Sequence, residues 1–142
     1  MGERQTVSDV VNNKAASIRL CVKRAREDHA AADDFASDFT RQDAAILNVL
    51  RACEQSVDLA NHITRTRKLG IPSHSRDAFR LLAREGLLPL PLSERLQRLI
   101  GFRNTAVHAY QALEIPLVEE VIDKGLEDLL AFANFMLKAA KE

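Results

Sequence analysis

The chain has 142 residues, a length that suits one domain with a single sizeable core. Apolar residues make up 46% of it and charged residues 28%, with only 5 glycines and 4 prolines, a balance that excludes a disordered protein. Lysine plus arginine equals aspartate plus glutamate, 20 against 20, so no positive field of the whole molecule attracts it to nucleic acid. We therefore expect one compact domain over residues 1–142.

The first predicted element is a long helix over residues 7–31. Its apolar side chains recur at the spacing of one helix face, and they are Val7, Val10, Val11, Ile18, Cys21, Val22 and Ala25. An acidic connection follows from Asp33 to Thr40. We expect Phe35 and Phe39 to anchor this connection to the core.

A second long helix is predicted to begin at Thr40, which would cap it with Asp43 in its first turn. The helix continues to about Lys68, where Gly70 and Pro72 end it. Its apolar face consists of Ile46, Val49, Leu50, Cys53, Val57, Ala60 and Ile63.

Three further helices are predicted in the second half of the chain. Ser75 would cap a short helix that closes near Gly86, and Pro89 and Pro91 would then stiffen a linker. Ser93 is expected to start a fourth helix.

Pro116 suits the first turn of a final helix. The apolar face of that helix consists of Leu117, Val121, Ile122, Leu126, Leu129, Leu130, Phe132 and Phe135. No segment alternates long enough to predict a strand. Five helices with short connections, two of them long and antiparallel, indicate an all-α, up-and-down helical bundle.

The cysteines and histidines indicate neither a disulfide framework nor a metal site. Cys21 and Cys53 each fall on the apolar face of a predicted helix, where a free thiol behaves as a small apolar group. Neither has a partner at metal-ligand spacing, and the four histidines are widely scattered. We expect no metal and no cofactor. With no secretory signal and no apolar run of bilayer length, we also expect the protein in the cytoplasm and away from membranes.

Charge is distributed unevenly along the chain. Residues 65–103 hold 9 basic and 3 acidic side chains. Residues 1–64 hold 8 basic and 10 acidic side chains, and residues 104–142 hold 3 basic and 7 acidic ones. Eight of the nine basic side chains in residues 65–103 are arginine, whose planar guanidinium group suits phosphate oxygens. The segment is either an anion-binding surface or a solvated face that acidic neighbours balance.

Residues 103–110, Arg-Asn-Thr-Ala-Val-His-Ala-Tyr, place polar groups inside an apolar helical stripe. The helical period puts Arg103 and Tyr110 on the face of Leu96, Leu99, Ile100 and Val107. Burying an unpaired guanidinium is costly, so Arg103 requires a carboxylate or a bound anion, or must line a cleft that solvent reaches.

A single straight helix does not aim both polar ends of this motif at one atom. Arg103 and His108 point about 140° apart, whereas Asn104 and His108 are neighbours one turn apart. Either the helix ends or bends between Arg103 and His108, or two copies of the motif face each other across a two-fold axis. We favour the shared cleft, with some fraying near Tyr110.

The pattern Arg-x4-His-x-Tyr, with Asn directly after the arginine in a small all-α chain, resembles the signature of the HEPN superfamily, in particular HepT-type toxins. The resemblance covers nearly the whole chain, including the order of its helices. It implies a metal-independent endoribonuclease that dimerises to form its active cleft. It also implies a partner, a minimal nucleotidyltransferase that acts as antitoxin by adenylylating the motif tyrosine.

Residue by residue, the resemblance assigns catalysis to Arg103 and His108. Arg103 would bind the scissile phosphate and stabilise charge on its oxygens, and His108 would transfer protons to or from the RNA. Asn104 would orient the histidine ring or hold a phosphate oxygen. Tyr110 would stand at the cleft mouth, where an adenylyl group blocks the entry of RNA.

Other interpretations of the same residues stay open. Glu54 and Asp58 belong to a polar line on the second helix, with Asn61 and His62, that offers a partner to Arg103. A purely structural ion pair is one possibility, and it is compatible with a catalytic arginine. The cleft could also belong to a non-catalytic module that binds a nucleotide or a partner protein, or to a helical adaptor.

Overall fold

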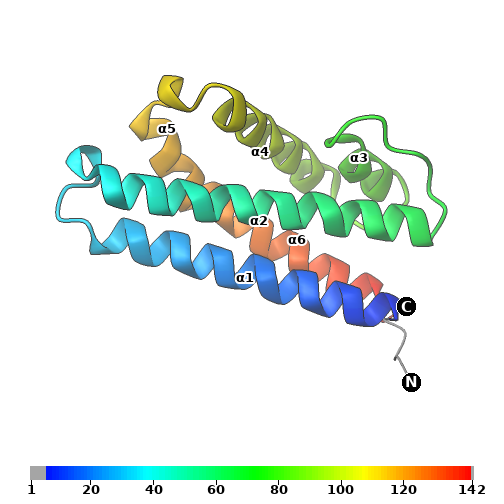
Figure 1. The fold of residues 1–142 in the computed structure, drawn as a ribbon. Coiled ribbons are helices and arrows are strands. Elements are labelled where there is room, and N and C mark those ends of the chain that lie inside the picture. The colour runs from blue at the N-terminus through cyan, green and yellow to red at the C-terminus, as the bar shows by residue number, and fades with distance from the viewer. Residues whose placement is uncertain (1–5, 142) are drawn as a thin grey trace.

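The computed structural model describes residues 6–141, and this part of the chain is built from helices without strands (Figure 1). Helices α1 (Val7–Ala31) and α2 (Phe39–Thr66) are antiparallel and pack along each other, joined by the 3-10 turn η1 (Phe35–Ser37). Helix α6 (Leu126–Ala139) packs against both, and α4 (Leu90–His108) contacts α2 and α6. The short α3 (Asp77–Arg84) packs on α2 and α4. The predicted all-α bundle is confirmed.

The final predicted helix is one continuous rod with an irregular centre. It consists of α5 (Ile115–Glu120), a π turn η3 (Val121–Gly125) and α6, with Pro116 in the first turn as predicted. At Gly125 a Cβ atom would lie 3.1 Å from a methyl carbon of Leu99, so this rod and α4 approach closely at the glycine. With the rod counted once, five helical rods are present in the described residues, as predicted.

The core lies where α1, α2, α4 and the final rod meet. Its fully buried side chains come from every rod, and the largest include Ile18, Leu59, Phe79, Leu96 and Phe132. The rings of Phe79 and Phe132 meet edge to face, with centroids 5.3 Å apart. Cys21 and Cys53 are free and buried, as predicted, and burial raises the pKa of the Cys53 thiol to about 12. The thiol therefore stays neutral at physiological pH.

Three predicted helix starts are wrong. The cap of helix α2 lies two residues before the expected one, because the Asp38 carboxylate accepts from the backbone N–H of Arg41, which leaves Thr40 inside the helix. At α3 the carboxylate of Asp77, and not Ser75, binds free backbone N–H groups, those of Ser73 and His74.

The start of α4 differs most from its prediction. The helix begins at Leu90, with Pro91 in its first turn, so the two prolines open the helix and do not form a linker. Ser93 is fully buried, and its hydroxyl donates to the carbonyl oxygen of Phe79 at 2.8 Å. Ser93 thus ties α4 to α3 and does not cap a helix.

The connection between α1 and α2 is anchored by one phenylalanine and not by two. Phe35 is buried, as expected, but Phe39 is 74% exposed. Because α2 already begins at Phe39, the helix period sets the direction of this side chain, and that direction is outward.

No helix in the described part of the chain is long and apolar enough to cross a membrane.

Candidate active site

Arg103 and His108 lie on one uninterrupted helix. Helix α4 continues through both residues and ends at His108, so the interpretation that it ends between them is wrong. The directions of the two side chains therefore differ by about 140°, as on an ideal helix. One copy of the chain does not bring both groups to one atom.

Arg103 is held by two oxygen acceptors. One terminal nitrogen, Nη2, donates to Glu54 Oε1 of α2 at 3.0 Å, and the other, Nη1, donates to Asn104 Oδ1 at 3.0 Å. The carboxylate expected from the second helix is therefore Glu54. The Arg103 side chain is 28% exposed and that of Glu54 is 50% exposed, so solvent reaches the pair.

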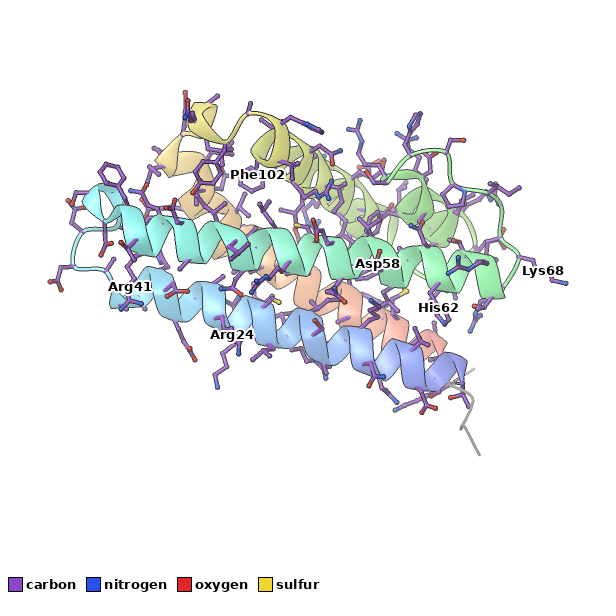
Figure 2. The ribbon with its side chains drawn as sticks, viewed as in Figure 1. Arg24, Arg41, Asp58, His62, Lys68 and Phe102 are labelled. Atoms are coloured by element: carbon purple, nitrogen blue, oxygen red, sulfur yellow. The ribbon has the colours of Figure 1, made fainter. Side chains whose placement is uncertain are left out.

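Asp58 is not the partner of Arg103. Its carboxylate pairs with Lys14 of α1 at 3.5 Å, and Figure 2 shows Asp58 on the exposed side of α2. Asp58 nevertheless lines a hollow of about 370 Å³ together with Glu54, Val57, Ser75 and Arg103. We call this the arginine hollow. It gives a ligand access to the guanidinium.

Asn104 supports the arginine and not the histidine. Its amide oxygen accepts from Arg103, which differs from the expectation that it orients the ring of His108. His108 is exposed at the end of α4, and no hydrogen bond or ion pair reaches its ring from residues 6–141. The imidazole is accordingly free to exchange protons with a molecule from outside the chain.

Tyr110 is positioned by the end of α4, and not by the helical stripe. The helix stops before it, and Tyr110 opens the 3-10 turn η2 (Tyr110–Ala112) with 42% of its surface exposed. Its hydroxyl donates to Asp43 Oδ1 of α2. The pKa of Tyr110 is raised to about 12. The largest cause is partial burial, followed by the hydrogen bond to the Asp43 carboxylate and the negative charge of that carboxylate. The phenol is therefore neutral at physiological pH.

The sequence interpretation missed Asp43 as a member of the site. Asp43 lies 67 residues before Tyr110 in the chain, and the sequence pattern predicts it as an acidic first-turn residue, although α2 begins at Phe39 and has no acidic residue in its first turn. No spacing pattern links residues this far apart. Within residues 6–141, histidine, cysteine, aspartate and glutamate side chains form no cluster that could hold a metal ion.

Comparison with known proteins identifies the family. A sequence model of the family described as Ribonuclease HepT-like matches residues 17–136, most of the chain. This chain belongs to the HepT-like ribonuclease family. The HepT-like assignment confirms the resemblance found in the motif, together with the predicted enzyme class, a ribonuclease toxin.

Similar proteins of known structure or name support the HepT-like assignment. The chain is 45% identical over 128 residues to a protein named mRNA nuclease HepT from Shewanella oneidensis, an alignment that covers 90% of this chain and 96% of that protein. A solved structure of a tri-AMPylated Shewanella oneidensis HEPN toxin in complex with MNT antitoxin matches with a TM-score of 0.86 and 45% identity, covering 92% of this chain and 98% of that one. A toxin–antitoxin structure with AMP-PNP matches with a TM-score of 0.86, 44% identity and the same coverage.

Proposed function

We propose that this chain is a metal-independent endoribonuclease toxin of the cytoplasm, active as a homodimer in which two copies of the motif form one cleft. The observation that carries this proposal is the placement of Arg103. Its guanidinium is held by Glu54 and Asn104 at a solvent-accessible hollow, while His108, on the same helix, points about 140° away. A second copy supplies the missing half.

The chemistry follows from the two side chains. The imidazole of His108 from one copy takes the proton of a ribose 2′-hydroxyl as the 2′-oxygen attacks the adjacent phosphorus. The bond from phosphorus to the 5′-oxygen breaks, and the same imidazole, now protonated, gives that oxygen a proton. The products are a 2′,3′-cyclic phosphate and a 5′-hydroxyl end.

Arg103 stabilises the negative charge that grows on the non-bridging phosphate oxygens during this step. Glu54 and Asn104 hold the guanidinium in place before RNA arrives. Proton transfer and charge stabilisation thus both come from side chains, and the reaction requires no metal ion.

We further propose that a nucleotidyltransferase antitoxin neutralises the toxin by modifying Tyr110. The Tyr110 oxygen would attack the α-phosphorus of ATP, pyrophosphate would leave, and the phenolic proton would pass to a base. Asp43 already accepts a hydrogen bond from this hydroxyl, which favours it as the first acceptor of the proton. The exposure of Tyr110 and the tri-AMPylated state of the similar HEPN toxin support this assignment.

The catalytic assignment is tested with purified, unmodified protein and single-stranded RNA in the presence of a metal chelator. We expect cleavage by the wild type and loss of cleavage in Arg103→Ala and in His108→Ala. Mixing the two variants should restore cleavage, because each mixed dimer retains one intact arginine and one intact histidine on opposite copies. Wild-type protein that binds RNA but leaves it intact would indicate a non-catalytic binding module instead.

The modification is tested separately by intact mass after co-expression with the nucleotidyltransferase. We expect adenylyl increments on the wild type and none on Tyr110→Phe. An unchanged increment in Tyr110→Phe would place the modification elsewhere.

A further inference from the structure

A second, larger hollow adjoins the arginine hollow. Its volume is about 810 Å³, and it lies between the C-terminal end of α2 and the segment of residues 70–76. Val57 and Ser75 line both hollows, so the two hollows meet at these residues. The remaining lining residues are Asn61, Arg65, Lys68, Gly70, Ile71, Pro72, Ser73 and His74. We call this the basic hollow.

The cations of the basic hollow have no partners within the described part of the protein. Arg65 and Lys68 form no ion pair and no side-chain hydrogen bond with residues 6–141, and no carboxylate lines the hollow. The other cations of the basic segment 65–103 differ, because most of them are bound by neighbouring oxygens, namely Arg67, Arg80, Arg84, Arg95 and Arg103. Within residues 65–103, the cations without an ion pair or a side-chain hydrogen bond to residues 6–141 are Arg65, Lys68, Arg76 and Arg98, and the first two line the basic hollow.

Arg76 is a further cation without a partner among residues 6–141, and it lies close to α4. Arg76 follows Ser75, and its Nη1 atom lies 3.8 Å from the position of a Cβ on Gly101 of α4. Gly101 and His108 are seven residues apart and share one face of that helix. By the helix period Gly101 and Arg103 point about 160° apart, so Arg76 lies toward the face of α4 that carries His108.

Lys68 occupies a backbone position that normally favours glycine. Its φ is +54°, and it is the only non-glycine residue with a positive φ in the described part of the chain. This left-handed residue ends α2, where glycine is the usual choice. A lysine there keeps a charge at the hollow at a cost in backbone conformation. Figure 2 shows its side chain extending outward from the end of α2.

An apolar surface accompanies these charges. Ile71 is 94% exposed at the rim of the basic hollow, next to Pro72, and Val57 lies at the boundary with the arginine hollow. Cations beside an exposed apolar surface suit a single nucleic-acid strand, whose phosphates meet the charges while a base covers the apolar groups.

We propose that the basic hollow binds the RNA strand next to the phosphate that is cleaved. Arg65 and Lys68 contact backbone phosphates there, a base lies on Ile71, and Arg76 contacts the strand near the face of α4 that carries His108. The inference rests on the ribonuclease function proposed above. It commits to RNA over an acidic protein segment because the hollow meets the site at which Arg103 would hold a phosphate.

Binding is measured first, with the His108→Ala variant and a fluorescent single-stranded RNA of about ten nucleotides. The test variant adds Arg65→Gln and Lys68→Gln to this background. The matched control adds Arg24→Gln and Lys124→Gln, which remove two other cations that have no ion-pair partner among residues 6–141. Figure 2 shows Arg24 on α1, away from α4 and the segment of residues 70–76.

Loss of two phosphate contacts reduces the slope of log affinity against log salt concentration by about 1.4, since each contact with a single strand contributes about 0.7. We expect this reduction in the test variant, and a largely unchanged slope in the control. Equal weakening by both pairs would show a general charge effect and overturn the proposal.

Cleavage kinetics in the otherwise wild-type chain give the second measurement. We expect Arg65→Gln with Lys68→Gln to raise KM for the longer RNA with little change in kcat. Cleavage of a dinucleotide, which is too short to reach the hollow, should be unaffected. Lys68→Gly should also raise KM while preserving or improving stability, because glycine suits the left-handed backbone.

The outcomes separate this inference from the function on which it rests. If the wild type cleaves RNA and the test variant is unchanged in binding and KM, the basic hollow plays no part in RNA binding. If the test variant loses affinity for the nucleotidyltransferase and not for RNA, the hollow is a protein docking site. If the salt slope falls as expected but the wild type leaves RNA intact, the ribonuclease proposal fails and the RNA-binding hollow remains.

Discussion

Replacing Arg103 with alanine separates a catalytic role of this residue from a structural one. In the folded chain its guanidinium pairs with Glu54, but the two side chains are 28% and 50% exposed. Ion pairs that solvent reaches to this degree contribute about 0.2–1 kcal/mol to stability. We therefore expect Arg103→Ala to lower the free energy of unfolding by about 1 kcal/mol.

The expected effect on the reaction is much larger. Removing a single preorganised group that stabilises transition-state charge typically lowers kcat by about 10²–10³, or about 2.7–4 kcal/mol. A residue that only supports the fold would show the opposite balance, with a loss of stability and normal cleavage by the molecules that remain folded.

The assay combines urea unfolding followed by circular dichroism with kcat for a single-stranded RNA. Arg26→Ala is a suitable control, because Arg26 pairs with Glu127 across α1 and α6 with similar exposures of 39% and 65%. We expect the two variants to lose similar stability and only Arg103→Ala to lose activity. A wild-type kcat in Arg103→Ala, or a stability loss of about 3 kcal/mol or more with retained kcat, would refute the catalytic role.

Three further predictions concern the surroundings of the site and the core. Tyr110 is the only tyrosine and the chain has no tryptophan, so near-ultraviolet absorbance follows this phenol alone. The phenol of Tyr110 should ionise at about pH 12 in the wild type and at a lower pH in Asp43→Asn. The contribution of Tyr110 to the stability of the fold is complete below about pH 10 and is lost as the pH rises through 12. An unchanged midpoint of ionisation in Asp43→Asn would contradict the contact between Tyr110 and Asp43. Ser93→Ala removes the donor to the Phe79 carbonyl in a fully buried position, and should cost about 1–3 kcal/mol in urea unfolding, whereas a neutral result would mean that this bond contributes little. Phe132→Ala leaves a cavity in the centre of the core and should lower the free energy of unfolding by about 3–5 kcal/mol. An unfolding midpoint near that of the wild type would contradict this prediction.

The helices were predictable because their main determinant is local. The 3.6-residue recurrence of apolar side chains placed α1 at residues 7–31 and located the other four rods. Most side chains of those faces pack in or against the core, but Val107 and Leu117, which were also assigned to apolar faces, are exposed. The start of each helix was less predictable. A serine or threonine hydroxyl can cap a helix or donate to a distant carbonyl, and Ser93 does the latter only because α3 lies across α4.

One part of the site was likewise predictable from the sequence, and another part was not. Arg103 stood out in the sequence as a charge within an apolar stripe, and the polar line on α2 already included Glu54, its partner in the fold. The packing of α4 on α2 then selected Glu54 over Asp58, which lies one turn further along and pairs with Lys14. Helix register across an interface depends on the whole core, and the sequence pattern leaves that register open.

By itself the sequence predicted which residues would carry the chemistry, because a charged or titratable group inside a periodic apolar face is visible without coordinates. Only the tertiary structure decided what those residues contact. It joined Tyr110 to Asp43, and Arg103 to Glu54 and Asn104, and it placed Arg65 and Lys68 at a hollow that the charge count alone could not locate. The physical reason is that helix periodicity is a property of neighbours in the chain, whereas contacts across 49 or 67 residues arise from how complete helices pack.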